Sequence, residues 1–507
     1  SLYTVSDDGT VSCECPYGQT VVEDVGNNGE CQDISPTGEP SGAPSGQPTG
    51  EPTSVPSVIY ALDTSSNLLA GSPWPSLGRS AFRHGTSPFY GPATPSDASV
   101  KWTFSVTDTD AIQSSPVVGP DDVVYVGSDG DHLDAVSKSG TIVWSFDCLT
   151  NLRAAPVLTQ TGKVVIGSRT GIWAVDQSTG ELDWSLDIEG DVLSSPTVDG
   201  SGNLFFGAND EKLHKVSSSG VLQWSCTLGD VVAESSPALS TSDNVVVIGA
   251  SDGVLYAADT SASDCSSFLW TYTTGGAIRS TPLIDDFGSV FVASRDGKVH
   301  AVSLSSGSAL WTYTSITNAD FDASPAIDRH GLFVYAADMD GRLYALAARD
   351  HPGESRVAGD EVWNVTVGSS GAAIESSIAV DIAGNIYLGS GDGSVYAFSQ
   401  AGEQLWSVAT GAAIGRSSVA IGGIGAVYVG NEAGTLVAIG PSTPQPACGS
   451  SDMAATLTNY ASTDIDLGCS SYCPAGKGMN TAGLCTICTT GYYSPATNIA
   501  CELCPAD

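Results

Sequence analysis

Basic residues are scarce in this sequence. Its 507 residues include 18 Lys and Arg against 56 Asp and Glu, which gives a net charge of −38. Charged residues make up 15% of the chain, where about 25% is usual. The chain is therefore poor in bases more than rich in acids. Binding to nucleic acids or to anionic membranes needs clusters of Lys and Arg, so this composition argues against both functions.

Long apolar runs are also missing. No stretch of about 18 apolar residues occurs, so we expect no membrane-spanning helix. The first residue is Ser1, and no signal-like apolar segment follows it. We expect that a leader or a longer N-terminal portion has been removed.

Cysteine is sparse in the middle of the chain and dense at both ends. Small terminal modules without a core need disulfides, and these persist only in oxidising compartments. We therefore predict a secreted, extracellular protein with disulfides among the terminal cysteines. Zinc binding by the CxxC pairs is the alternative, but no His lies near them. The predicted disulfide cysteines are Cys13, Cys15, Cys31, Cys448, Cys469, Cys473, Cys485, Cys488, Cys501 and Cys504.

Proline occurs at every fourth position from Pro36 to Pro56. This stretch has no amphipathic face, so we expect an extended, solvated spacer. Ser and Thr beside Pro suit O-glycosylation; a plain flexible spacer is the alternative. Asn364-Val365-Thr366 is the sole N-glycosylation sequon. The predicted glycosylation sites are Ser41, Ser45, Thr49, Thr53 and Asn364.

One unit repeats eight times in the middle of the chain. Each unit opens on Ser-Ser-Pro or a variant, continues with an alternating apolar run and a turn that is often Asp-Gly, and leads to a Trp. The third opening positions are Pro116, Pro156, Pro196, Pro237, Pro282, Pro325, Ile378 and Val419. The Trp column, predicted to lock each blade to its neighbour, is Trp102, Trp144, Trp184, Trp224, Trp270, Trp311, Trp363 and Trp406.

A period of about 40 residues with four short strands predicts a β-propeller blade. The last unit lacks a Trp strand, and the segment 100–104 ahead of the first unit is a spare one. It can complete the last blade and close the ring. The predicted fold is all-β: an eight-bladed β-propeller at 58–442, flanked by small disulfide-rich modules at 1–34 and 443–507 and by a Pro/Ser/Gly spacer at 35–57.

The run from Ala174 to Trp184, A-V-D-Q-S-T-G-E-L-D-W, resembles the docking motif of PQQ-type quinoprotein propellers. The lead-in from Trp74 through Pro92 is similar to that of PQQ-like repeat proteins, which include non-enzymatic scaffolds. The N-terminal cysteines resemble the last part of an EGF-like module, and the C-terminal ones resemble the cysteine-rich repeat of ephrin receptors. The spacer is similar to PSGQPT-type spacers of stramenopile algae and oomycetes.

Quinoprotein dehydrogenases hold PQQ over a calcium ion near a disulfide of adjacent cysteines, so the resemblance raises the question of a reaction. This sequence contains no Cys-Cys pair. His214 and His300 occupy one repeat column, which favours packing over metal ligation. The Asp-Gly repeats are typical of hairpin turns, with calcium loops as the alternative. We therefore predict no catalytic residue, no cofactor and no metal site.

Three functions remain from this reading. The first is a structural or interaction glycoprotein of a cell-surface matrix, fibre or flagellar-hair-like filament, whose partners are other copies of itself, other surface proteins or glycans. The second is a PQQ-dependent dehydrogenase. The third is a carbohydrate-binding propeller. We expect the first, because no catalytic set is assembled in the sequence.

Overall fold

The computed structural model describes residues 67–69, 71–107, 110–240, 242, 244–350, 356–368 and 371–441, together with short strands in the terminal segments. The chain divides into two units, Ser1–Ser54 and Val55–Asp507. The first contains an antiparallel sheet of β1 (Tyr3–Val5), β2 (Val11–Glu14) and β3 (Thr20–Val22). In the second, β36 (Lys477–Met479) pairs with β37 (Cys485–Ile487), and β38 (Tyr492–Tyr493) pairs with β39 (Glu502–Leu503).

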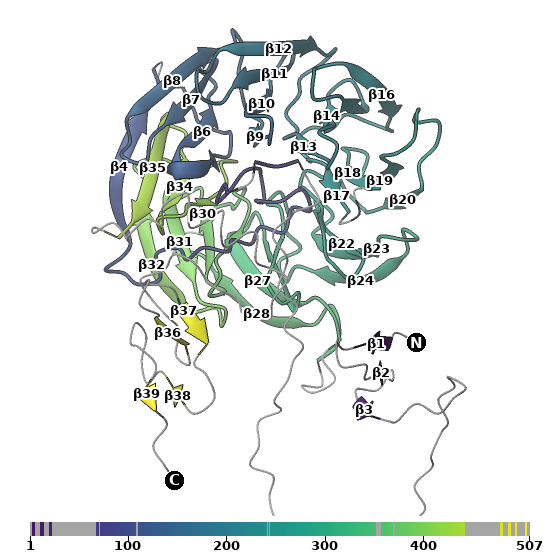
Figure 1. The fold of residues 1–507 in the computed structure, drawn as a ribbon, viewed down its shortest axis with the longest axis vertical. Coiled ribbons are helices and arrows are strands. Elements are labelled where there is room, and N and C mark those ends of the chain that lie inside the picture. Colours follow the sequence, from purple (N-terminus) through teal and green to yellow (C-terminus); the bar gives the residue numbers. More distant parts are fainter. Residues whose placement is uncertain are drawn as a thin grey trace, which may run out of the picture. The chain divides into compact units, whose positions relative to one another are not determined.

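The rest of the second unit forms eight four-stranded antiparallel sheets arranged as the blades of a ring (Figure 1). This confirms the predicted all-β, eight-bladed propeller. Each blade runs from a short inner strand to an outer strand that carries the Trp. Blades 1 to 4 are β5 (Val117–Val118), β6 (Val124–Gly127), β7 (His132–Val136), β8 (Ile142–Asp147); β9 (Val157–Leu158), β10 (Lys163–Gly167), β11 (Gly171–Asp176), β12 (Leu182–Asp187); β13 (Thr197–Val198), β14 (Leu204–Ala208), β15 (Lys212–Val216), β16 (Leu222–Thr227); and β17 (Ala238–Leu239), β18 (Val245–Gly249), β19 (Val254–Asp259), β20 (Trp270–Thr273).

Blades 5 to 8 repeat this plan. The described residues contain a single 3-10 turn, at Pro120–Asp122 in blade 1. Their strands are β21 (Leu283–Ile284), β22 (Ser289–Ser294), β23 (Lys298–Ser303), β24 (Ala309–Thr314); β25 (Ala326–Ile327), β26 (Phe333–Ala337), β27 (Arg342–Ala347), β28 (Glu361–Thr366); β29 (Ala379–Val380), β30 (Ile386–Gly389), β31 (Ser394–Phe398), β32 (Gln404–Ala409); and β33 (Ala420–Ile421), β34 (Val427–Gly430), β35 (Thr435–Gly440) with β4 (Ser99–Ser105).

The ring is closed by the spare strand, as the repeat count predicts. Strand β4 pairs antiparallel with β35, and Trp102 lies opposite Ala438. The last blade therefore takes its outer strand from the start of the propeller and its other three strands from the end. This arrangement removes the open seam that a linear series of blades would leave.

Most repeats open on two hydroxyl residues that bond to the backbone in different ways. The first accepts a hydrogen bond from the backbone within its own blade, as Ser114 does from Gly127 N–H. The second accepts one from the preceding blade, as Ser236 Oγ does from Ser195 N–H at 2.9 Å. The second positions form what we call the hydroxyl ring: Ser115, Ala155, Ser195, Ser236, Thr281, Ser324, Ser377 and Ser418.

The hydroxyl ring lacks one link, because Ala155 has no hydroxyl to accept the Ser115 N–H. Ala155→Ser is expected to raise the free energy of unfolding by about 0.5–1.5 kcal/mol, the usual net contribution of one hydrogen bond. The converse variant Ser324→Ala removes a link of 2.9 Å to Thr281 N–H and should lower it by a similar amount. Chemical denaturation of both variants measures this, and an Ala155→Ser protein no more stable than the native chain would contradict it.

The Trp column joins neighbouring blades at the outer rim. Trp144 Nε1 donates to Gln177 O of the next blade at 2.9 Å. Gly180, in the turn of that blade, adopts a φ of +73°, and a Cβ there would lie 2.7 Å from the Trp144 ring. The docking motif therefore needs glycine for both backbone conformation and contact. The same bond to the next blade is made by Trp102, Trp184, Trp270, Trp311 and Trp363.

The predicted terminal disulfides, the EGF-like and ephrin-receptor-like patterns and the O-glycosylation sites lie outside the residues whose side chains the structure describes. Within the described part of the chain, no helix has the length and apolar character needed to cross a membrane.

Candidate functional site

One end of the propeller channel is filled by the segment that precedes β4. Residues 67–69 and 71–92, which we call the plug segment, cross the centre of the ring (Figure 1, purple). Their backbone forms hydrogen bonds at the ends of the inner strands of blades 1 to 7, so the lead-in motif belongs to the core of the propeller. The inner-strand partners are Val118, Leu158, Asp199, Leu239, Ile284, Ile327 and Val380.

Arg83 anchors the plug segment. Its side chain is buried, and its guanidinium donates to Leu77 O at 2.7 Å and to Pro237 O, Ser195 O and Pro196 O at 3.0 Å. Burial lowers the pKa of this guanidinium to about 9. The backbone at Arg83 is left-handed, with a φ of 64°. One side chain therefore joins the plug segment to blades 3 and 4 through carbonyl oxygens.

The opposite end of the channel carries a ring of charged side chains. They project from the loops just before the inner strands, next to the hydroxyl ring. Three arginines and three acids give this mouth a formal charge of zero in a chain with a net charge of −38. The charged mouth residues are Arg153, Glu234, Arg279, Asp322, Glu375 and Arg416.

A salt bridge spans this mouth. Arg416 Nη2 lies 2.7 Å from Glu234 Oε1, although these residues lead into blades 8 and 4, on opposite sides of the ring. Arg279 Nη1 approaches the same carboxylate at 3.5 Å, and Arg416 Nε lies 3.5 Å from Glu375. Burial raises the pKa of Glu234, and the two arginines oppose that rise. We call this group of two arginines and two glutamates, centred on the Arg416–Glu234 salt bridge, the bar. Its formal charges cancel, and it crosses the mouth of the channel.

The pocket left between this bar and the plug segment is small. Its cavity volume is about 70 Å³, and Leu77 of the plug segment forms part of its wall. Sites for cofactor-sized ligands measure about 300–1,000 Å³, so a tricyclic quinone does not fit the residues present. No cluster of three or more His, Cys, Asp or Glu suited to a metal ion occurs in the described ranges. The cavity has room for a few water molecules.

The strength of the bar can be measured by a double-mutant cycle. Glu234→Gln combined with Arg416→Met is expected to show a coupling energy of about 1–2 kcal/mol, because both side chains are largely shielded from solvent. The pair Arg169–Asp191, at 3.4 Å and more exposed, is the control and should give about 0.5 kcal/mol or less. Equal coupling in both pairs would show that the cross-channel pair is an ordinary surface contact.

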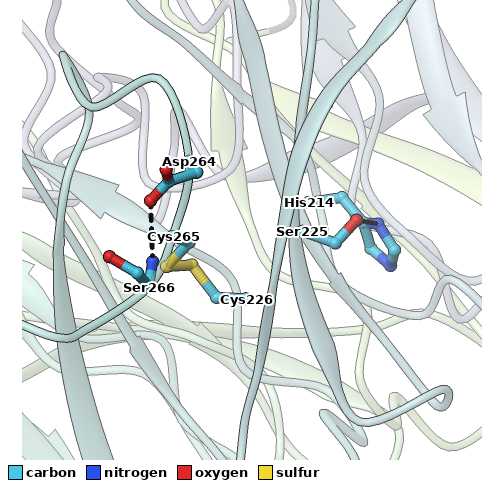
Figure 2. Close-up of a disulfide and its surroundings, with 6 residues drawn as sticks. All are labelled: His214, Ser225, Cys226, Asp264, Cys265 and Ser266. Atoms are coloured by element: carbon cyan, nitrogen blue, oxygen red, sulfur yellow. Dashed lines mark hydrogen bonds between the residues drawn. A yellow bond between two sulfur atoms is a disulfide. The ribbon is translucent and has the colours of Figure 1, made fainter.

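His214 and His300 are buried strand residues that bond to the preceding turn. His214 Nε2 lies 3.1 Å from Asp210, and its Nδ1 lies 2.9 Å from Ser225 Oγ (Figure 2). His300 Nε2 likewise lies 3.2 Å from Asp296. In blades 4 and 7 a Tyr hydroxyl takes this place and donates to the turn Asp at 2.6 Å. The Ser-His-Asp contact in blade 3 is therefore a variant of a repeated turn anchor.

This anchor gives a pH dependence with a defined sign. Burial lowers the pKa of His300 below its usual value, and Asp296 partly opposes this. Protonation thus favours the unfolded chain, and stability from this group is lost as pH falls through about 6.5. His300→Tyr, which copies blades 4 and 7, should remove that loss. Melting temperatures at pH 7.5 and 5.5 test this: the native chain should fall further than the variant, and parallel curves would contradict it.

The remaining predicted residues do not converge on a site. Asn364 lies on β28, where its side chain donates to Glu361 at 2.6 Å and accepts from Arg342 at 2.8 Å; its glycosylation stays a prediction. The eight Trp residues lie around the outer rim. Cys148 is a buried free thiol, and burial raises its pKa above the usual range.

A disulfide between Cys226 and Cys265 is a structural feature that the sequence reasoning missed. It connects β16 of blade 3 to the loop 260–269 of blade 4, with a Cα–Cα distance of 5.1 Å (Figure 2). The two cysteines are 39 residues apart, close to one repeat length. That spacing was the available signal, since residues one repeat apart lie at neighbouring blades.

Comparison with protein-family models matches the family described as "Outer membrane protein assembly factor BamB" at residues 94–225, 133–277, 184–356 and 269–420. The matched segments span more than half of the chain. The chain belongs to this family. Comparison with curated proteins gives no match.

Solved structures share the fold of this BamB-family propeller. BamB from Moraxella catarrhalis has a TM-score of 0.54 at 18% identity, covering 68% of this chain and 97% of that one. Quinohemoprotein alcohol dehydrogenase from Comamonas testosteroni has a TM-score of 0.58 at 14% identity, covering 77% and 82%. The computationally designed protein Ika8 has a TM-score of 0.55 at 16% identity, covering 66% and 98%. At these identities the likeness establishes the fold alone.

Proposed function

We propose that this chain is a non-catalytic scaffold: an extracellular structural or interaction glycoprotein whose propeller serves as a rigid disc in a surface matrix or filament. The observation that carries the proposal is the closure of the propeller channel at both ends. The plug segment fills one end, and the Arg416–Glu234 pair crosses the other at 2.7 Å. Cofactor sites measure about 300–1,000 Å³, whereas the cavity at this mouth measures about 70 Å³, which supports a non-catalytic role.

The disulfide between blades 3 and 4 supports the extracellular part of the proposal. Structural disulfides persist in oxidising compartments and are rare in reducing ones. Cys226 is fully buried within the hydrophobic core of these blades, so the bond belongs to the packed propeller. The few basic residues and the predicted glycosylation sites fit the same compartment.

Assembly is the property to measure. Light scattering and negative-stain imaging of the full chain, purified under oxidising conditions, should reveal ordered assemblies. Because each copy carries a net charge of −38, their repulsion must be screened, and divalent cations or high salt should favour assembly. Monomers under every ionic condition, together with dye-linked alcohol oxidation in the presence of PQQ and calcium, would overturn the proposal in favour of the quinoprotein alternative.

A further inference from the structure

The seam between blades 3 and 4 lacks the Trp hydrogen bond that joins other blades. Trp224 Nε1 is buried and has no hydrogen-bond partner among the described residues. The carbonyl at the equivalent turn position is that of Thr260, and Lys215 Nζ donates to it at 2.7 Å. Lys215 stands where the equivalent residue of the other blades is Ala, as at Ala174 and Ala257. At this seam the carbonyl that usually accepts from a Trp accepts from Lys215 instead.

The loop of blade 4 at this seam is also different. The corresponding turns of blades 1, 2, 3, 5, 6 and 7 place a glycine against the Trp ring, as Gly220 does beneath Trp184. The loop 260–269 contains no glycine. It holds Cys265, which is bonded to Cys226, two residues beyond Trp224 (Figure 2). The disulfide therefore lies at the seam that lacks both the Trp hydrogen bond and the glycine contact, beside the Lys215–Thr260 hydrogen bond.

We propose that the Cys226–Cys265 disulfide is an oxidation-dependent latch for the outer part of the blade 3–blade 4 seam, a role that goes beyond that of a passive scaffold. With the bond formed, Cys265 and Phe268 of the loop 260–269 pack against the core cluster that contains Trp224. With the bond reduced, the loop detaches and exposes the apolar surface beneath it. The native chain thus has two states of one rim segment, selected by the redox conditions around it.

Reduction uses an external thiol. A reductant thiolate attacks Sγ of Cys265, the more exposed of the two residues, and the S–S bond breaks with its electron pair leaving on Cys226, which takes a proton. A second reductant thiolate then attacks the reductant sulfur of the mixed disulfide, and Cys265 leaves as a thiolate that takes a proton. Two cysteine thiols form, and the reductant leaves as its own disulfide.

The opening stays local because other contacts hold the seam at its inner end. Ser195 N–H donates to Ser236 Oγ at 2.9 Å in the hydroxyl ring, which joins blade 3 to blade 4 near the channel. Arg83 also binds carbonyls of Pro196 and Pro237 in the two blades. These bonds do not depend on the disulfide. The propeller should therefore stay closed while its outer rim opens.

Hydrogen-exchange mass spectrometry of the full chain, oxidised and after treatment with a phosphine reductant, tests the latch. Reduction is expected to raise exchange at least tenfold in residues 260–269 and in β16 and β20, with no change at the blade 6–blade 7 seam. There Trp363 donates to Gln400 O at 3.0 Å. The double variant Cys226→Ser with Cys265→Ser separates this effect from the reduction of other cysteines, and should show the fast exchange before any reductant is added.

Two results would overturn the latch. One is unchanged exchange in residues 260–269 of both the reduced chain and the double variant, which would show that packing alone holds the loop. The other is faster exchange across all blades, which would show that the bond supports the whole fold. Neither result bears on assembly, which is measured separately under oxidising conditions.

Discussion

Replacing Arg83 with methionine is expected to lower the free energy of unfolding by about 3–5 kcal/mol. The guanidinium satisfies the carbonyl oxygens of Leu77, Ser195, Pro196 and Pro237 in the interior. Methionine fills a similar volume but donates nothing, so these acceptors lose their partner, at about 1–3 kcal/mol for each buried group left unsatisfied. The saving from no longer burying a charge offsets part of this cost.

Urea denaturation of the full chain measures the effect. Lys138→Met, at an exposed turn position, is the control and should change stability by less than about 0.5 kcal/mol. Arg83→Lys keeps the charge but loses the planar fork that reaches several carbonyls at once, so it should fall between the native chain and Arg83→Met. An Arg83→Met protein as stable as the Lys138→Met control would show that the plug segment is held without its anchor.

Deleting residues 1–92 is expected to abolish cooperative unfolding of the propeller, whereas deleting residues 1–66 should leave its melting temperature nearly unchanged. The longer deletion removes the backbone bonds of the plug segment to seven blades, each with a net value of about 1 kcal/mol. It also removes the buried side chains of Trp74 and Phe82, at about 2–3 kcal/mol each. Their sum is comparable with the whole stability of a typical domain.

Differential scanning calorimetry compares the two deletions, both of which keep β4 and hence the closing strand. The shorter deletion is the matched control, since it removes chain but none of the plug bonds. A sharp transition for the longer deletion, within a few degrees of the control, would mean that the blades are self-sufficient and that the plug segment is an accessory.

The repeat-based part of the fold could be predicted from the sequence because the same pattern of apolar, turn and Trp residues occurs in eight units. The Trp column, the Asp-Gly turns and the spare segment 100–104 all follow from patterns that recur in register. Strand β4 pairs with β35 as the closure argument requires. Residues at equivalent positions of the repeats make equivalent contacts, as most residues of the Trp column do with the next blade, so the repeat pattern predicts those contacts.

The channel could not be predicted in the same way, because its contacts occur once and join distant positions. Arg83 and Pro237 are 154 residues apart, and no pattern relates them. A weak signal did exist for the bar. Units 4 and 8 each carry one extra residue before Ser-Ser, as in Ala233-Glu234 and Gly415-Arg416. Glu234 and Arg416 occupy these two extra positions, and their side chains meet across the channel mouth at 2.7 Å.

The sequence patterns also predicted only some of the disulfide bonding. The density of cysteines at the termini drew attention to the ends of the chain, whereas the disulfide that the structure describes joins two of the isolated cysteines in the middle. Cys226 follows Trp224 on an outer strand, and Cys265 lies in the loop of the next blade. The packing of blade 4 against blade 3 brings these two positions together. Residues about one repeat apart in a propeller can therefore be in contact although they are distant in the sequence.

Titration of the full chain with PQQ in the presence of calcium, followed by equilibrium dialysis, tests the closed channel most directly. The account predicts no saturable binding by the native chain, because the plug segment and the Arg416–Glu234 bar leave a cavity of about 70 Å³ between them. One equivalent of quinone held at micromolar concentration, with dye-linked oxidation of an alcohol, would contradict it and identify the propeller as an enzyme.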